Sequence, residues 1–386
     1  MDSLTRYCLG LTQVFEARSQ MTTTKAFTGE YVVKPVESSD LSRAIDIWSL
    51  SFGFMDRDRW SMFYDSFLDT AIGAYTDDYL VAIVGIANFQ MWLGEQLVPC
   101  AGVSAVAADP AHRRKGLIRR CLTACLQESH RKRVPLTSLW PFSYPFYRRM
   151  GYDVTDMQYH VEIDLRSLPE VGDATKYRRH HLDHYDPLKP IHENWIKQSN
   201  LSIKRGDLQW RRLLSHPERL VCGFKHDDGY ILWNIKDKVN RTLEVFEWAW
   251  NTREAFHDGL ALLKRMDDLN FDKVKFKMSN IDQLLELGIT DPQPNIAFKP
   301  GLMTRVLHTG AFIEALGKNI APFLIDDPLG VSESHESSKL RGSTRSLTPG
   351  EVVQVATDFF SQKPDGVPDG LYRAVATRKN YSVEFF

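Results

Sequence analysis

The segment "DPAHRRKGLIRRCL", residues 109–122, combines residue types that can bind an anion. Arg113 and Arg114 supply guanidinium donors, and Gly116 lacks the Cβ that would keep a ligand away from the backbone. Apolar residues at helical spacing follow, so Gly116 should lie at a helix N-terminus, where unpaired N–H groups favour phosphates. The segment predicts a local pyrophosphate cradle. A basic helix start that merely faces solvent is the alternative.

A second segment, "YPFYRRMGY" at residues 144–152, places a tyrosine where it can act as an acid. Its pattern predicts a short helix that carries Tyr147, ends at Gly151 and leads into the next strand. A phenol, with a reference pKa of about 10, is a reasonable proton donor to a thiolate of similar basicity. A packed aromatic at a helix end is the structural alternative.

Together the two segments resemble the Gcn5-related N-acetyltransferases (GNATs), in which RxxGxG/A binds acetyl-coenzyme A (acetyl-CoA) and a tyrosine in "FYxxxGF" protonates the leaving thiolate. "VSAVAADPAHRRKGLIRR" followed by "FYRRMGYDV", a second degenerate unit and the final "EFF" are similar to the enhanced intracellular survival (Eis) family of aminoglycoside and amine acetyltransferases. The resemblance runs from Tyr31 to Phe386 and is strongest over 99–155. It implies acetyl-CoA as cosubstrate and a homo-oligomer, a hexamer in that family.

By matching positions, the resemblance assigns acetyl-CoA to six residues: Val106, Ala108, Arg113, Arg114, Gly116 and Ile118. The first two would offer strand amides to the thioester and pantetheine, and the other four would line the pyrophosphate turn. Ile118 stands where many GNATs have Gly or Ala, which matters little because this position offers its backbone N–H.

The resemblance also assigns the proton transfers. Tyr147 would be the general acid and the α-carboxylate of Phe386 the general base. An α-carboxylate, with a reference pKa of about 3.5, is a weak base unless apolar groups surround it, and the neighbouring aromatic residues supply such groups. A chain end that merely packs is the alternative.

The acceptor pocket is expected at "SFGFMDRDRW", where Phe52, Asp56 and Trp60 match family positions. An aromatic wall with one carboxylate suits a cationic amine. A solvated loop with incidental aromatics is the alternative.

The elements that position these residues predict an α/β (α+β) fold with tandem GNAT-type mixed-sheet domains and a shortened sterol-carrier-like C-terminal domain. Residues 31 to about 164 read as strands and helices in the order βαβββαβαβ. A polar linker follows, and a similar order restarts at 191. The predicted ranges are a tail at 1–30, a catalytic domain at 31–170, a degenerate second GNAT domain at 171–300 and the last domain at 301–386.

The second unit has "NTREAFHDG" where a cradle would stand, so it should not bind the cofactor. The Ser-rich stretch "GVSESHESSKLRGSTRSLTPGE" reads as a mobile loop. The apolar end "YSVEFF" is expected to dock rather than hang free.

The amino-acid composition narrows the classes of binding partner that the protein can have. Lys plus Arg total 48 against 49 Asp plus Glu, which leaves no broad cationic field for nucleic acid or an anionic membrane.

No apolar stretch reaches the roughly 18 residues of a membrane span, so a cytoplasmic protein is expected, with a transit peptide in residues 1–25 as the alternative. Cys121 and Cys125 share an apolar helical face and should be core residues. No metal is expected; His180, His181 and His184 form a minor zinc alternative, against a solvated linker.

The expected function is acetyl-CoA-dependent N-acetylation of primary amines on cationic small molecules, such as aminoglycosides or polyamines. Two alternatives remain open. One is a protein-lysine acetyltransferase, and the other is an acyl-CoA or lipid-binding scaffold in which the cradle survives without catalysis.

Overall fold

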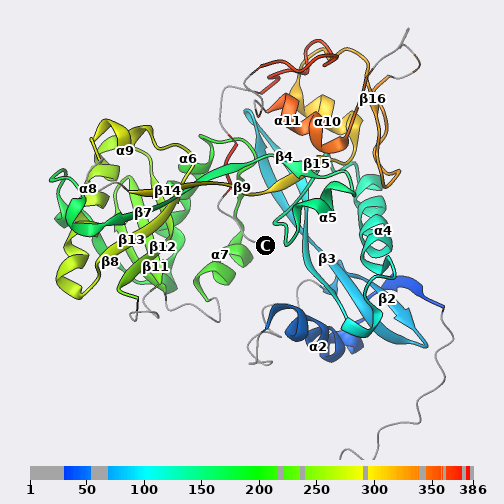
Figure 1. Cartoon of the computed structure of the whole chain (residues 1–386), viewed down its shortest axis with the longest axis horizontal. Helices are drawn as coiled ribbons and strands as arrows, with labels where there is room; N and C mark the ends of the chain where they lie inside the picture. The colour runs from blue at the N-terminus through cyan, green and yellow to red at the C-terminus, as the bar shows by residue number, and fades with distance from the viewer. Residues whose placement is uncertain are drawn as a thin grey trace, which may run out of the picture.

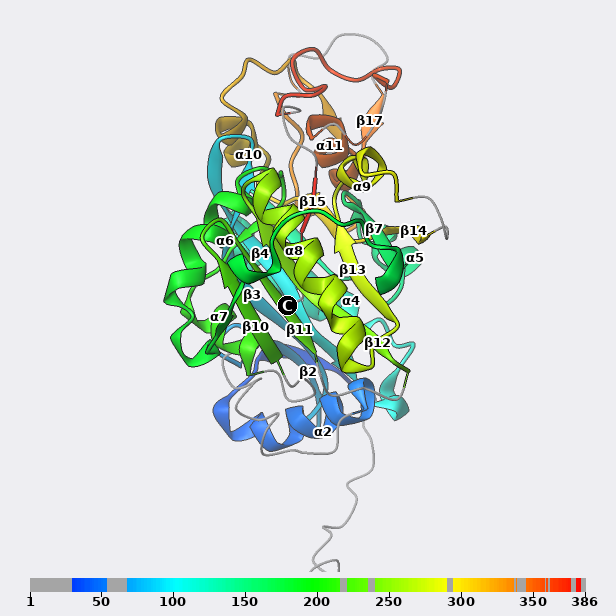
Figure 2. The same ribbon diagram turned by 90° about the vertical axis from the view of Figure 1, so that its left-hand side faces the viewer.

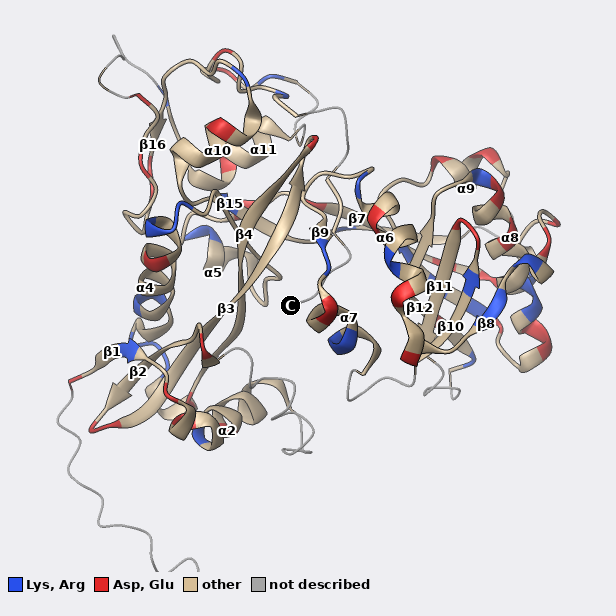
Figure 3. Ribbon diagram, turned by 180° about the vertical axis from the view of Figure 1, so that it is seen from behind, with Lys and Arg blue, Asp and Glu red and all other residues tan. Residues whose placement is uncertain are grey.

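The protein, as a computed structural model, has two halves, each built around a mixed sheet (Figure 1). The structure describes residues 30–53, 68–215, 221–234, 240–289, 294–336, 338, 345–357, 359, 362–375 and 380–382. None of the described helices is long and apolar enough to cross a membrane. Basic and acidic side chains are distributed over both halves (Figure 3).

The first sheet has the order β1-β2-β3-β4-β5-β15-β6, with β9 paired to β3. Its strands are β1 (Val32–Pro35), β2 (Ile72–Thr76), β3 (Tyr79–Leu93), β4 (Gln96–Ala108), β5 (Leu136–Leu139), β6 (Asp153–Val154), β9 (Ile203–Lys204) and β15 (Met303–Val306). Its helices are α2 (Leu41–Phe52), α4 (Leu117–Arg131) and α5 (Tyr144–Arg148). Strands β4 and β5 are parallel, and α4 connects them.

The second sheet has the order β14-β7-β13-β12-β11-β10-β8. Its strands are β7 (Met157–Asp164), β8 (Arg178–His180), β10 (Val221–His226), β11 (Gly229–Asn234), β12 (Thr242–Trp250), β13 (Lys273–Met278) and β14 (Asn295–Pro300). Helices in this half are α6 (Lys189–Ile196), α7 (Asp207–Leu214), α8 (Arg253–Lys264) and α9 (Asp282–Glu286). The parallel pair β12–β13 is connected by α8, which crosses one face of the sheet (Figure 2). The second half thus repeats the arrangement of β4, α4 and β5.

Three strands cross between the predicted domain ranges. Strand β9 lies within the range 171–300, yet it pairs with β3 in the first sheet. Strand β7 lies within the range 31–170, yet it pairs with β13 and β14 in the second sheet. Strand β15 lies within the range 301–386, yet it pairs with β5 and β6 in the first sheet. The ranges 31–170, 171–300 and 301–386 therefore do not coincide with the sheets, because the sequence pattern identifies a strand but not its partner.

The C-terminal segment packs on the first sheet. It contains α10 (Thr309–Leu316), the short parallel pair β16 (Leu324–Ile325) and β17 (Ser346–Leu347), and α11 (Pro349–Ala356). Phe312, Val352 and Val353 are buried in one apolar cluster with strands β3 to β5. A sterol-carrier-like fold for this segment stays a prediction.

The start of the Ser-rich stretch is held in place, contrary to expectation. Val331 and Ser332 donate their amides to the Asp327 carboxylate at 2.8 Å each, and His335 exchanges backbone hydrogen bonds with Phe323. The expectation of a mobile loop is therefore wrong for residues 331–335. The sequence did not reveal this because the partners that hold the stretch lie outside it.

The element order predicted for the first half is confirmed, with the short β6 as an addition. Cys121 and Cys125 are core residues of α4, as predicted, and burial raises the pKa of Cys121 to about 12. A thiol with such a pKa stays protonated at neutral pH and is a poor nucleophile.

Candidate cofactor and catalytic site

A bulge in β4 opens the first sheet where the cofactor residues were predicted. The register between β3 and β4 shifts between Ile83 and Gly85, and Ala105 adopts a φ of 53°. A positive φ is strained for a residue with a Cβ, and bulges of this kind occur beside active sites. The indole of Trp48 donates to the Ala105 carbonyl at 2.9 Å and fixes the bulge.

The same strand separates from β5 at this point. Strands β4 and β5 pair only from Cys100 to Gly102, and no described strand covers that side of β4 beyond Gly102. Val106 and Ala108 lie in the uncovered stretch and are half-buried. The backbone there is open to an extended ligand, which suits the role predicted for these two residues.

The loop from Asp109 to Gly116 leads from β4 into α4 and leaves the helix N-terminus uncapped. Arg114 and Gly116 both have left-handed backbone, with φ of 61° and 71°. Gly116 is the N-cap residue of α4, and no side chain caps the helix. A Cβ built on Gly116 would meet nothing within 4 Å. The amides of the first turn, including that of Ile118, therefore face open space.

Charge around this N-terminus favours an anion. The first turn of α4 holds no acidic residue, and Arg113 and Arg114 are exposed beside it. Asp109, in the loop that leads to this helix, is paired with Arg43. Burial alone would raise the pKa of Asp109, but the hydrogen bond from Arg43 holds it below its usual value. The predicted cradle thus has the geometry and the charge to hold a phosphate group.

Tyr147 lies in the apolar cluster against which residues of the predicted cradle also pack. It is 2% exposed, and Val106, Ala108 and Ile118 pack against the same cluster. The rings of Phe142, Phe146 and Tyr152 contact it edge-on or nearly so, with centroids 5.1–6.1 Å away.

The Tyr147 hydroxyl makes no hydrogen bond to the described part of the chain. Burial, with a smaller contribution from Tyr152, raises the pKa of this phenol above its usual value, so it carries its proton at neutral pH. The hydroxyl of Tyr144, one turn earlier, is already used in a hydrogen bond to the Pro300 carbonyl at 2.7 Å. Of these two tyrosines, Tyr147 is the one with a proton to offer a ligand.

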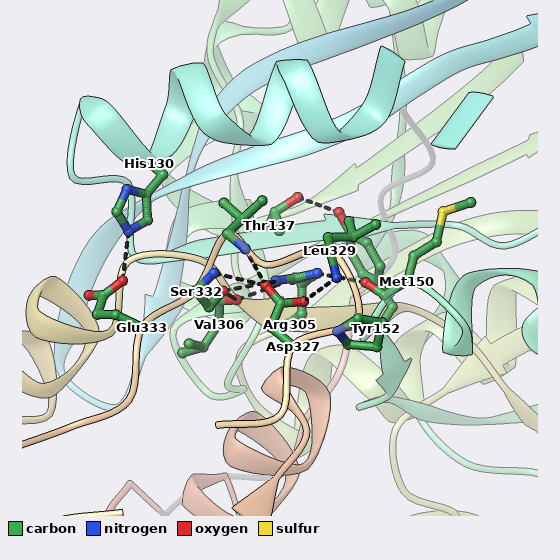
Figure 4. Close-up of polar contacts among 12 residues, drawn as sticks. His130, Thr137, Met150, Tyr152, Arg305, Val306, Asp327, Leu329, Ser332 and Glu333 are labelled. Atoms are coloured by element: carbon green, nitrogen blue, oxygen red, sulfur yellow. Dashed lines mark hydrogen bonds and ion pairs between the residues drawn. The ribbon is translucent and has the colours of Figure 1, made fainter. Parts of the chain in front are cut away.

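A buried arginine holds the end of helix α5, as Figure 4 shows. Arg305, on β15, is fully buried and donates to the Met150 carbonyl at 2.6 Å and to Asp327 at 2.6 Å. Its guanidinium also lies 5.7 Å from the ring centroid of Tyr152. Burial would raise the pKa of Asp327, but Arg305 holds it below its usual value. This network fixes the turn that follows Tyr147, and sequence reasoning missed it.

Replacing Arg305 by methionine should lower the free energy of unfolding by about 3–5 kcal/mol, because the buried Asp327 carboxylate loses its counter-charge. Urea denaturation measures this loss. The double change Arg305→Met with Asp327→Leu is the control and should recover part of it. A loss below about 1 kcal/mol in the single variant would show that the pair does not hold α5.

The second half lacks the features of the cradle. Thr252 caps α8 by accepting from the Ala255 amide at 3.1 Å, and Glu254 places a negative charge in the first turn. Both features disfavour an anion at this helix N-terminus. That the second unit does not bind the cofactor stays a prediction.

The remaining predicted residues fall into two groups. Phe52 is half-exposed at the end of α2 and is not among the residues of the Tyr147 cluster, whereas Asp56, Trp60 and Phe386 lie outside the described residues. The acceptor pocket and the base therefore stay predictions.

The zinc alternative gains no support. A ring nitrogen of His180 forms a hydrogen bond with the His184 carbonyl at 2.8 Å. Within the described chain, His180, His181 and His184 do not form a set of metal ligands.

Known proteins with similar sequences contain the same two units. Residues 32–155 and residues 201–306 each match a family described as an acetyltransferase (GNAT) domain. The N-acetyltransferase Eis of Mycobacterium tuberculosis is 28% identical over 244 residues, which cover 58% of this chain and 59% of that protein. The match therefore spans about three fifths of the relative's length.

Solved structures share the whole fold. A probable N-acyltransferase from Enterococcus faecalis V583 superimposes with a TM-score of 0.75 at 19% identity, covering 92% of this chain and 100% of that one. Eis1 from Mycobacterium abscessus gives a TM-score of 0.70 at 17% identity with the same coverage. At these identities the likeness shows the fold alone.

Proposed function

We propose that this chain, which contains two units that match acetyltransferase (GNAT) domains and is similar to Eis, transfers the acetyl group of acetyl-CoA to primary amines of cationic small molecules. The observation that supports the proposal most is that Tyr147, a buried phenol with no hydrogen bond to the described part of the chain, shares one cluster with an uncapped, cationic helix N-terminus. Acetyl-CoA supplies an activated thioester, and the chain supplies the groups that bind it and move protons.

The binding groups act at two places. The amides at the start of α4, with Arg113 and Arg114, would hold the pyrophosphate, and the open edge of β4 at Val106 and Ala108 would hold the pantetheine arm. A ligand extended between them would bring its thioester toward Tyr147, because all these elements border the same cluster.

In the transfer step, the amine nitrogen attacks the thioester carbon, the new C–N bond forms and the C–S bond breaks. The departing sulfur takes the proton of Tyr147, and the amine gives up a proton to a base. We assign that base to the α-carboxylate of Phe386 and the acceptor pocket to Phe52, Asp56 and Trp60. The buried docking of Asn380–Ser382 between the two halves supports the placement of the chain end near the site.

The direct test is release of free thiol from acetyl-CoA in the presence of aminoglycosides, polyamines and lysine peptides. Thiol release with the cationic small amines alone would support the proposal. Release with peptides alone would identify a protein-lysine acetyltransferase. Tight acetyl-CoA binding with no release for any amine would identify a non-catalytic acyl-CoA-binding protein.

Replacing Arg114 by glutamate should weaken acetyl-CoA binding about 10- to 100-fold, because one charged hydrogen bond of about 1.5–3 kcal/mol is lost beside the pyrophosphate. Titration calorimetry measures the affinity and should give one site per wild-type chain. Arg253→Glu, the same charge change in the first turn of α8, is the matched control and should leave the affinity unchanged. Two equal sites, or equal losses in both variants, would contradict the placement of the cradle.

A further inference from the structure

The C-terminal residues Asn380–Ser382 are held in the interior between the two halves (Figure 1, the red segment beside β9). The Tyr381 amide donates to the Asn200 carbonyl at 3.0 Å. The Asn380 side chain donates to the Thr155 carbonyl at 2.7 Å and to Thr357 at 2.8 Å. Ser382 is fully buried. The last described residues are therefore fixed by both halves of the molecule.

The final contact of this segment involves two buried side chains, Asp156 and Gln158. The Gln158 amide donates to the Ser382 carbonyl at 2.6 Å and to the Asp156 carboxylate at 2.8 Å. The Asp156 carboxylate also accepts the backbone amide of Ser382. Together the two side chains bind both the N–H and the C=O of Ser382, as a neighbouring strand would.

Asp156 is an unusual residue for a purely structural role. It is fully buried, no ion pair with it is found among the described residues, and its Oδ1 has no hydrogen-bond partner there. Burial of a carboxylate without a counter-ion is costly, and an asparagine could accept the same amide without that cost. A carboxylate at this place therefore calls for a role in which its charge matters.

We propose that Asp156, together with Gln158, is a positioning residue that holds Ser382 so that the α-carboxylate of Phe386 reaches the acceptor amine, and that ionisation of Asp156 loosens this hold. This inference rests on the proposed function, in which Phe386 is the base. Four residues separate Ser382 from the chain end, a reach of about 14 Å when extended, so the anchor limits where the carboxylate can go.

The charge state of this anchor changes near neutral pH. Burial raises the pKa of Asp156 to about 7, against smaller lowering effects from its hydrogen bonds and from Lys277 on β13. Among the described residues, Tyr144 on α5 and Tyr381 in the tail are the other titratable groups that interact with it, and both stay protonated because the pKa of each is raised. The raised pKa of Asp156 reflects burial in the docked state, so ionisation weakens docking and the anchor loosens as pH rises through about 7.

Linkage gives the same sign for the stability of the whole fold. Between the unfolded pKa of about 3.9 and the folded value of about 7, the native state binds more protons, so this group lowers stability as pH rises through that window. A rise in kcat over the same pH window thus cannot come from a stabilising effect of Asp156 ionisation on the folded state.

The test compares the wild type, Asp156→Asn and Gln158→Met between pH 5.5 and 8.5. Hydrogen exchange of the C-terminal peptide, corrected for intrinsic rates, follows the anchor, and kcat with one fixed amine follows the reaction. We expect tail protection to fall through about pH 7 in the wild type. Asp156→Asn, which cannot ionise, should remove this fall, and Gln158→Met should lose tail protection at every pH and lower kcat roughly 10-fold. The affinity for acetyl-CoA should stay unchanged in both.

Asp272→Asn, which changes an exposed carboxylate of the second half, is the matched control and should behave as the wild type. A fall of tail protection with pH in Asp156→Asn as large as in the wild type would overturn the inference, as would altered tail exchange with unaltered kcat in Gln158→Met. Two variants are used because either one alone could fold poorly. Failure of the proposed function looks different: the wild type itself would then release no thiol, whatever its tail exchange.

Discussion

Tyr147→Phe is expected to lower kcat about 100-fold or more while the affinity for acetyl-CoA stays unchanged. The change removes only the hydroxyl, and that hydroxyl makes no hydrogen bond to the described chain, so neither packing nor a structural contact is lost. What is lost is the proton for the departing thiolate. Single-turnover kinetics with a reactive amine, together with calorimetric titration of acetyl-CoA, separates these two effects.

Tyr144→Phe is the matched control, since it removes the same group from the same short helix. The Tyr144 hydroxyl donates to the Pro300 carbonyl, so its loss should change stability slightly and turnover by no more than a few-fold. Equal losses of turnover in both variants would point to a disturbed helix rather than to an acid. Full activity of Tyr147→Phe would make this residue a packed aromatic only.

Addition of one glycine after Phe386 should also lower kcat by about 100-fold. The extra residue moves the α-carboxylate by about 3.5 Å, and a displacement near 1 Å already costs about that factor when a reacting group must be aligned. Acetyl-CoA should bind as before, because the cradle lies on α4. Turnover and cofactor affinity are compared for the native chain, the extended chain and a chain without Phe386.

A glycine added at the N-terminus is the control for an extra residue as such. Native turnover in the C-terminally extended chain would exclude the terminal carboxylate as the base. Glu384 would then be the nearest alternative, and the assignments of the cradle and of Tyr147 would stand.

Local patterns predicted the parts of the site that local geometry determines. Gly116 and the apolar repeat after it gave the start of α4, because a helix N-terminus needs only a short stretch of chain to form. The same holds for α5 with Tyr147 and for its end at Gly151, whose φ is 78°. The helical spacing of the apolar residues also placed Cys121 and Cys125 correctly in the core.

The parts that depend on distant partners could not be predicted in this way. Ala105 gives no local sign of a bulge, because its strain is accepted only where Trp48 binds its carbonyl. Arg305 reads as an ordinary strand residue until Asp327 and the Met150 carbonyl are placed around it. A polar residue inside an apolar strand such as "GLMTRVL" is the one signal that pointed to a buried partner.

The exchange of β7 and β15 between the sheets bears on how the chain can be made and divided. The first sheet is complete only when Val306 has left the ribosome, since β15 fills the place between β5 and β6. The two halves therefore cannot fold one after the other during synthesis. A nascent chain that ends near residue 155 would expose the unpaired edge of β5. A fragment cut at the boundary of the first GNAT match would carry the cradle and Tyr147 but not the strand that holds α5 in place.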